Sequence, residues 1–198
     1  MFIGSFFERI YMISVKKDLQ NYLFADMQAN NIDLHSFKGK INYYFNPRIR
    51  FIVMMRYYEY YSDKKGIGKV LKFWYYWRFK KLSYKLGYTI YKNNFGPGVC
   101  FAHYGTLVVN KKARIGSNCR IHVCVNIGGT NEGVPTIGDN VYIGPGVKIF
   151  GPITIGNNVT IGAGAVVNKS FPDNVVIAGV PAKIIKYKSN HEKDTFSF

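Results

Sequence analysis

PTIGDNVYIGPGVKIFGPITIGNNVTIGAGAVV, residues 135–167, repeats with a period of six. An aliphatic side chain returns at every sixth position, and the same spacing continues towards the N-terminus. The repeated positions are Ile115, Ile121, Ile127, Ile137, Ile143, Ile149, Ile155, Ile161 and Val167. An α-helix has a period of 3.6 and a strand a period of 2, whereas each flat face of a parallel β-helix takes one hexad. We therefore predict a mainly β chain in which residues 91–187 form a parallel β-helix.

The repeat slips twice. Ten residues separate Ile127 from Ile137, which predicts a four-residue insertion within residues 128–136. Fourteen residues separate Phe101 from Ile115 where twelve would fit, which predicts two extra residues near positions 103–109. Insertions in a solenoid form loops on one face, and that face is often the binding face. The alternative is a coil that merely tolerates them.

Residues 1–90 have a helical pattern. Asn46 followed by Pro47 is a typical helix start, and an apolar face follows it. A second helix is predicted over about residues 65–86, with Gly87 as its stop and with an apolar face. That face comprises Ile67, Val70, Leu71, Trp74 and Leu82. Residues 6–29 are also predicted to be helical, and residues 188–198 form a polar tail.

The net charge of +16 is concentrated in this N-terminal region. Its aromatic and basic segment, residues 65–88, suits a helix lying at an anionic membrane surface. Packing of these helices on the coil with a solvated basic rim is the alternative, and no motif supports nucleic-acid binding. The sequence has no apolar run of membrane-spanning length and no signal-peptide pattern. Its three cysteines are an odd number and include no CxxC motif, so a disulfide framework is not expected. We therefore expect a reduced cytoplasmic protein with thiols in its core.

Two histidines lie where chemistry is expected. His103 falls at the first slip, and His122 follows the inward Ile121, one turn above Ala102. A neutral imidazole suits removal of a proton from an attacking alcohol. A solvated corner histidine is the alternative interpretation of His103. His35 and His191 lie in weakly patterned segments and are poor candidates.

Four segments carry a resemblance to a known family. They are FAHYGTLVV (101–109), IGGT (127–130), IGAGAVV (161–167) and AGVPAK (178–183). They resemble the serine acetyltransferase branch of the hexapeptide acyltransferases, above all the members that O-acetylate sugars in capsule, O-antigen and exopolysaccharide pathways. The resemblance implies a left-handed coil, a homotrimer with sites between neighbouring coils, and direct transfer from acetyl-CoA with His103 as the base and without a metal.

The resemblance also implies further site residues. His122, Ala102 and Tyr104 are acceptor-site candidates, and the backbone amides of Gly128 and Gly129 are oxyanion candidates. The candidates for binding acetyl-CoA are Gly144, Gly146, Ala163, Ala165, Lys169, Pro181 and Lys183.

The acceptor is predicted from positions at which this chain differs from serine acetyltransferases. Serine acetyltransferases carry an aspartate before the catalytic histidine and a second histidine before the proline that follows the Gly-Gly-Thr loop, where this chain has Ala102 and Val134. They also carry an acid near the first coil, where this chain has Tyr88 and Thr89. These differences predict a neutral carbohydrate acceptor. The membrane location suggested by residues 65–88 would suit a lipid-linked glycan at the inner face of the membrane. Serine O-acetylation, a zinc hydratase, and a non-enzymatic scaffold or membrane-docking module are the alternatives.

Overall fold

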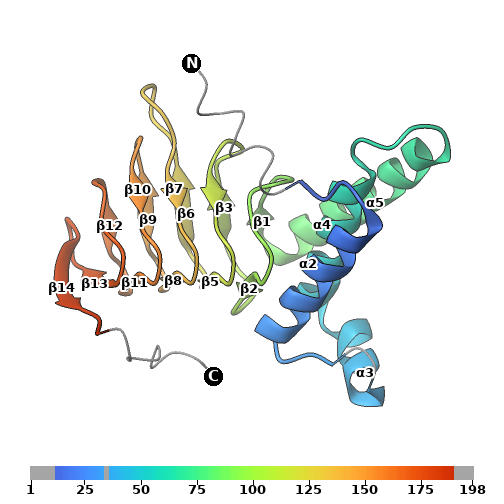
Figure 1. Cartoon of the computed structure of the whole chain (residues 1–198), viewed down its shortest axis with the longest axis horizontal. Coiled ribbons are helices and arrows are strands. Elements are labelled where there is room, and N and C mark those ends of the chain that lie inside the picture. Colours follow the sequence, from blue (N-terminus) through green and yellow to red (C-terminus); the bar gives the residue numbers. More distant parts are fainter. Residues whose placement is uncertain (1–11, 34–35, 190–198) are drawn as a thin grey trace.

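The computed structural model describes residues 12–33 and 36–189. Short strands are stacked along the long axis of the molecule, and the helices lie at one end of the stack (Figure 1). The helices are α2 (Lys16–Ala29), α3 (Phe37–Phe45), α4 (Pro47–Tyr61) and α5 (Ile67–Leu86). The strands are β1 (Tyr88–Thr89), β2 (Cys100–Phe101), β3 (Leu107–Val109), β4 (Arg114–Ile115), β5 (Arg120–Ile121), β6 (Val125–Gly128), β7 (Thr136–Ile137), β8 (Tyr142–Ile143), β9 (Lys148–Phe150), β10 (Thr154–Ile155), β11 (Thr160–Ile161), β12 (Val166–Val167), β13 (Val175–Ala178) and β14 (Lys183–Tyr187).

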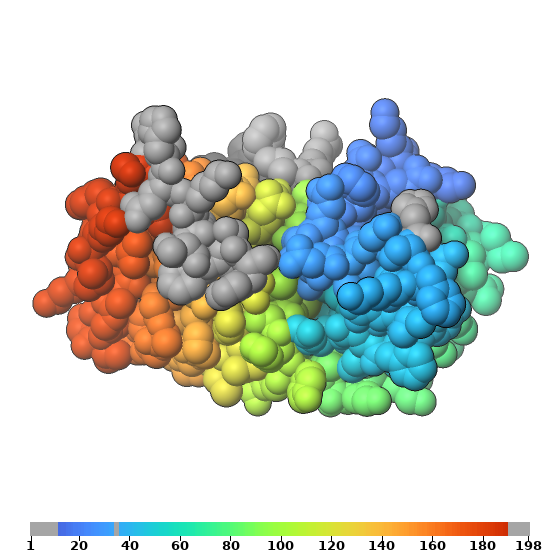
Figure 2. Space-filling model, turned by 90° about the horizontal axis from the view of Figure 1, so that it is seen from below, coloured from blue at the N-terminus to red at the C-terminus, as the bar shows by residue number. Residues whose placement is uncertain are grey.

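The strands form the three faces of a parallel β-helix, which confirms the predicted fold. Their orders are β1-β3-β6-β9-β12, β10-β7-β4 and β14-β13-β11-β8-β5-β2. The pairings are parallel except that β14 runs antiparallel to β13 at the far end of the stack. Ile121 pairs with Ile143, and Ile143 with Ile161, so three hexads make one turn. Figure 2 shows the same order of turns along the molecular surface.

The repeated aliphatic side chains form the core of the coil. All nine positions have relative exposures of 2% or less. The asparagines at the corners adopt positive φ angles, which asparagine tolerates better than most residues. Their side-chain amides also form a ladder, with Asn140 donating to Asn158 at 3.1 Å and Asn158 donating to Asn174 at 2.9 Å. The six-residue period therefore satisfies both the packing of the core and the conformation of the corners.

Both slips lie where the sequence predicts them. The longer insertion leaves the coil after β6 and returns at β7, and it contains an antiparallel bridge between Thr130 and Gly133. Figure 1 shows it projecting beyond the neighbouring corners. The shorter slip separates β2 from β3.

Charged groups connect the helices to the first turn of the coil. Arg56 of α4 is fully buried and pairs with Asp26 of α2, with 2.8 Å between Arg56 Nε and Asp26 Oδ2. Arg56 also pairs with the buried Glu59 and donates to the carbonyl oxygens of Phe95 and Gly96. Asp26 accepts hydrogen bonds from the backbone amides of Gly98 and Val99, at 2.8 and 2.9 Å. The pair thus joins two helices to the coil.

Several local expectations need correction. The helix predicted from residue 6 begins at Lys16, residues 12–15 are not helical, and residues 6–11 lie outside the described residues. α3 was not predicted; Ser36 caps it by accepting a hydrogen bond from the Gly39 amide. Asn46 caps α4 as predicted, and Gly87 ends α5 in the left-handed conformation. Of the three cysteines, Cys100 and Cys119 are buried, but Cys124 is exposed and is not a core thiol.

The predicted apolar face of α5 is wrong in part. Leu82 is buried and Leu71 half-buried, but Ile67, Val70 and Trp74 are exposed, because α5 packs on α4 through a different face. Tyr75 and Phe79 lie on the packed face and stack on Tyr57 and Tyr58 of α4. In the portion of the chain that the structure describes, no helix is long and apolar enough to cross a membrane.

Candidate active site

The corner between β2 and β3 is the irregular corner that carries His103. β2 stacks on β5, so that Phe101 lies level with Ile121, and β3 stacks on β6, so that Val109 lies level with Ile127. Between these matched levels the lower turn has two residues more than the upper one. They bulge outward and leave His103 and the next residue, Tyr104, exposed at the surface.

Three side-chain hydrogen bonds fix the backbone of this corner. The Tyr88 hydroxyl donates to the His103 carbonyl oxygen at 2.6 Å. Arg48, in the first turn of α4, donates from Nη1 to the carbonyl oxygen of Phe101 at 2.8 Å and also to that of Ala102. Burial raises the pKa of Tyr88, so its hydroxyl remains a donor at physiological pH. The helical region therefore positions the histidine corner.

The end of α5 provides further backbone contacts. The amide of Gly105 donates to the carbonyl oxygen of Leu86 at 3.0 Å, and the amide of Leu107 donates to that of Gly87 at 3.1 Å. Neither Arg48 nor Tyr88 was predicted from the sequence to be part of this site. The one signal for Tyr88 was its place, since it stands where the resemblance leads one to expect an acid.

His122 lies one turn above Ala102, as predicted from the register, and its ring lies beside that of His103. The ring centroids of the two histidines are 5.8 Å apart, and those of His122 and Tyr142 are 5.1 Å apart. Desolvation lowers the pKa of His122, and the positive charge of Arg120 and the neighbouring His103 lower it further. His122 Nε2 is buried and has no hydrogen-bond partner among the described residues. These contacts favour a neutral imidazole beside His103.

A column of small residues extends from the two histidines along the coil, towards its C-terminal end. The register that aligns Phe101, Ile121, Ile143, Ile161 and Ile177 also aligns the residues that follow them. Those residues are Ala102, His122, Gly144, Gly162 and Ala178. Above His122 the column therefore carries no side chain larger than a methyl group, and it leaves room along the coil surface.

Packing between turns explains part of this column. A Cβ atom at Gly144 would lie 2.8 Å from the carbonyl oxygen of Ile161 and 2.9 Å from the amide nitrogen of Ala163. A glycine at this position is therefore required by the close approach of the next turn. Gly146 has a φ angle of +77°, which also favours glycine.

The remaining predicted residues are spread over several turns. Gly128 is half-buried and Gly129 exposed, at the start of the longer insertion. Ala163 is exposed, but Ala165 is fully buried and its methyl group points into the core rather than towards a groove. Lys169, Pro181 and Lys183 are exposed near the far end of the coil, and Lys169 Nζ lies 5.6 Å from the centroid of the Phe171 ring. His35 and His191 lie outside the described residues.

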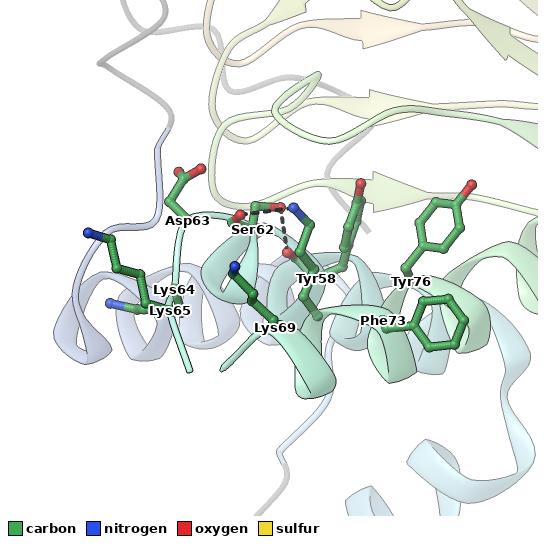
Figure 3. Close-up of a pocket in the computed structure, with 9 residues that line it drawn as sticks. Tyr58, Ser62, Asp63, Lys64, Lys65, Lys69, Phe73 and Tyr76 are labelled. Carbon is green, nitrogen blue, oxygen red and sulfur yellow. Dashed lines mark hydrogen bonds between the residues drawn. The ribbon is translucent and has the colours of Figure 1, made fainter. Parts of the chain in front are cut away.

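Two cavities differ in their relation to the histidines. A cavity of about 300 Å³ adjoins Tyr104. It is lined by Asn42, Phe45, Asn46, Pro47, Arg48 and Tyr104. A larger cavity, of about 720 Å³, lies between α4 and α5 and contains no histidine (Figure 3). We take the histidine corner as the candidate site because it holds the imidazole predicted from the sequence, whereas lysines, aromatic side chains and Asp63 line the larger cavity. The described residues contain no group of three or more His, Cys, Asp or Glu side chains placed to hold a metal ion.

The family model, the related sequences and the similar solved structures agree with one another. Residues 135–169 match the family model "Bacterial transferase hexapeptide (six repeats)". A serine acetyltransferase of Buchnera aphidicola is 38% identical over 106 residues, which cover 51% of this chain and 41% of the relative. The crystal structure of serine acetyltransferase from Brucella abortus is similar with a TM-score of 0.70 and 30% identity, over 88% of this chain and 71% of that one. The same enzyme in complex with coenzyme A gives a TM-score of 0.70 at 29% identity, with 88% and 70% covered.

These relatives correct one prediction. They are named serine acetyltransferases, so the predicted likeness to capsule and O-antigen enzymes and the predicted carbohydrate acceptor are wrong. The error has a physical cause: the absence of two charged contacts at Ala102 and Val134 shows which groups do not bind an acceptor, and leaves open which groups do. This chain covers about two fifths of the length of the curated relatives. On the evidence of its coil and its relatives, the chain belongs to the hexapeptide-repeat acyltransferase family.

Proposed function

We propose that this protein transfers an acetyl group from acetyl-CoA to the hydroxyl of serine, with His103 as general base. The observation that carries the proposal is the position of His103, on a braced corner at the foot of a column of small residues. The names of the relatives support the acceptor and the donor, since they are serine acetyltransferases and one was crystallised with coenzyme A.

The proposed reaction is direct. His103 accepts the proton of the serine hydroxyl while that oxygen attacks the carbonyl carbon of the thioester. The carbon–sulfur bond then breaks, and the CoA thiolate takes up a proton, for which the protonated His103 is the nearest source. General-base assistance of this kind contributes about 10²–10⁴-fold to a rate. The negative charge on the carbonyl oxygen needs preorganised donors, and the backbone amides of Gly128 and Gly129 are our candidates.

The column of small residues suggests where the donor lies. An extended pantetheine arm would run past Gly144 and the exposed Ala163, which carry no side chain larger than a methyl group. Lys169 and Lys183 are exposed near the end of the coil that lies away from the helices, and they are candidates for binding the CoA phosphates. We also propose that the protein is a homotrimer, in which a neighbouring coil forms the second wall of this groove.

The acceptor must be bound without the aspartate and second histidine of the serine enzymes. Arg48 lines the cavity of about 300 Å³ next to Tyr104 and supplies a positive charge there for the carboxylate of serine. A charge-assisted hydrogen bond contributes about 1.5–3 kcal/mol, so the missing contacts predict weaker binding of serine than in those relatives. We therefore expect a high KM for serine rather than an absence of turnover.

The test is CoA release measured with acetyl-CoA and a series of L-serine concentrations. We expect saturable, serine-dependent release that His103→Ala reduces by at least about 100-fold. Release that does not depend on serine, or that is unchanged in His103→Ala, would refute the proposal.

A further inference from the structure

The face of α5 that points away from α4 carries an apolar stripe. Its residues are Val70, Phe73, Trp74, Trp77 and Tyr84. Steps of three and four residues place them on one side of the helix, opposite Tyr75, Phe79 and Leu82, which pack against the rest of the protein. Val70 is 67% exposed, Phe73 64% and Trp77 59%. Large apolar side chains this exposed in one row indicate a surface with a partner.

The charge beside the stripe has one sign. α5 contains six basic residues, Lys69, Lys72, Arg78, Lys80, Lys81 and Lys85, and no acid. Lys69 and Lys80 flank the stripe on one side of the helix, and Lys85 and Arg78, which lies over the Trp74 ring, flank it on the other, while Lys81 falls within the stripe. Basic residues on both sides of an apolar and aromatic row are the pattern of a helix that lies in a membrane interface with its lysines at the level of the lipid phosphates.

The larger cavity lies along one edge of this stripe. Its lining includes Lys64, Lys65, Lys69 and Lys72, against the single acid Asp63. Phe73 lines this cavity (Figure 3) and is also one of the stripe residues. Lys72 Nζ donates to the Ser62 carbonyl oxygen and Lys64 Nζ to that of Ser14, but the ammonium groups of Lys65 and Lys69 have no hydrogen-bond or ion-pair partner in the described parts of the chain. Two ammonium groups are thus available at the edge of the apolar stripe.

We infer that α5 docks on an anionic lipid bilayer, with the stripe inserted among the upper acyl chains and the cavity lysines against the headgroup phosphates. A negatively charged lipid surface is the partner that meets both features at once. It covers the apolar row, and it neutralises the lysines on either side. The inference does not rest on the proposed acetyl transfer, and the stripe residues varied below, Val70 and Phe73, lie at the other end of α5 from Leu86 and Gly87, which anchor the His103 corner.

The chain has a built-in probe for this inference. Both of its tryptophans, Trp74 and Trp77, lie on the stripe, so tryptophan emission, excited at a wavelength that tyrosine does not absorb, reports on the stripe. We expect a blue shift with vesicles of phosphatidylcholine and phosphatidylglycerol, and quenching when the acyl chains are brominated. Vesicles of phosphatidylcholine alone are expected to give neither.

Two variants keep both tryptophans and separate the two contributions. The double variant Val70→Ser/Phe73→Ser removes apolar area, and Lys65→Glu/Lys69→Glu reverses the charge at the cavity. Each is expected to weaken co-sedimentation with the anionic vesicles by at least about tenfold. Matched controls are Ile185→Ser and Lys111→Glu/Lys112→Glu on the exposed surface of the coil, which are expected to bind like the wild type.

Three results would overturn the inference. The first is co-sedimentation no greater than with phosphatidylcholine alone. The second is salt-sensitive binding without quenching by brominated chains, because the stripe then does not insert. The third is a smaller assembly for Val70→Ser/Phe73→Ser in light scattering together with no vesicle binding by the wild type, because a second copy of the chain then covers the stripe.

Discussion

The hydroxyl of Tyr88 donates a 2.6 Å hydrogen bond to the backbone carbonyl oxygen of His103. The resemblance to serine acetyltransferases leads us to expect an acidic side chain near this position, where it would orient the proposed base. In this protein the buried phenol holds the backbone that carries the imidazole. We therefore propose that the main chain of the corner positions His103, the proposed base; Arg48 holds the two preceding residues through their carbonyl oxygens.

Tyr88→Phe removes this hydrogen bond without removing the ring. We expect the free energy of unfolding to fall by about 0.5–1.5 kcal/mol, the usual net contribution of one hydrogen bond. We also expect kcat to fall while KM for acetyl-CoA is unchanged, because the donor groove does not include Tyr88. Tyr84→Phe, at an exposed tyrosine of α5, is the matched control. An unchanged kcat in Tyr88→Phe would show that the bond serves stability alone.

Substitutions of His103 and of His122 should change different kinetic constants. His103→Ala should lower kcat by at least about 100-fold, since the base is lost. His122→Ala should mainly raise KM for the acceptor, because His122 contacts the corner from one turn above without being the base. Steady-state kinetics with both substrates varied distinguish the two. Equal losses of kcat in both variants would require the two imidazoles to act as one unit.

The lowered pKa of His122 predicts a dependence of stability on pH. The unfolded chain takes up a proton at this histidine near the ordinary pKa of 6.5, whereas the folded protein resists it. Between these two pKa values the unfolded state holds more protons, so stability is lost as the pH falls below about 6.5. His122→Gln should therefore lose less stability than the wild type between about pH 7.5 and about pH 5.5. Urea unfolding at several pH values tests this, and parallel curves for the two proteins would contradict it.

The buried pair of Arg56 and Asp26 should dominate the docking of the helices on the coil. Asp26→Asn leaves the guanidinium of Arg56 with one carboxylate, Glu59, and weakens the contacts to the Gly98 and Val99 amides. Breaking a buried ion pair from one side costs about 3–5 kcal/mol. Denaturant titration should show that loss, while Asp63→Asn, at an exposed acid, should change stability little. A loss below about 1 kcal/mol would show that the pair is dispensable.

The coil could be predicted from the sequence because its core imposes one rule on every turn. Ile121, Ile143 and Ile161 stack on one another, so each must be aliphatic, and any change in length shows as a slip in phase. The slip at residues 103–109 identified the irregular corner for the same reason. This signal is strong because it is repeated.

The parts that could not be predicted depend on contacts without a repeat. Arg48 reaches Phe101, and Tyr88 reaches His103, across many residues of sequence, and no period relates them. The apolar periodicity of α5 marks two faces, and it does not say that Tyr75 and Phe79 pack on α4 while Val70 and Trp74 remain exposed. The acceptor was mispredicted because absent groups at Ala102 and Val134 do not define the groups that replace them.

Following radiolabelled acetyl from acetyl-CoA in the presence of L-serine would decide whether His103 catalyses direct transfer. We expect the label to appear on the serine oxygen as O-acetylserine and the protein itself to retain none. We also expect His103→Ala to form less than about a hundredth of the product. Label that remains on the protein, or product formation that continues unchanged without the imidazole of His103, would refute direct transfer by this base.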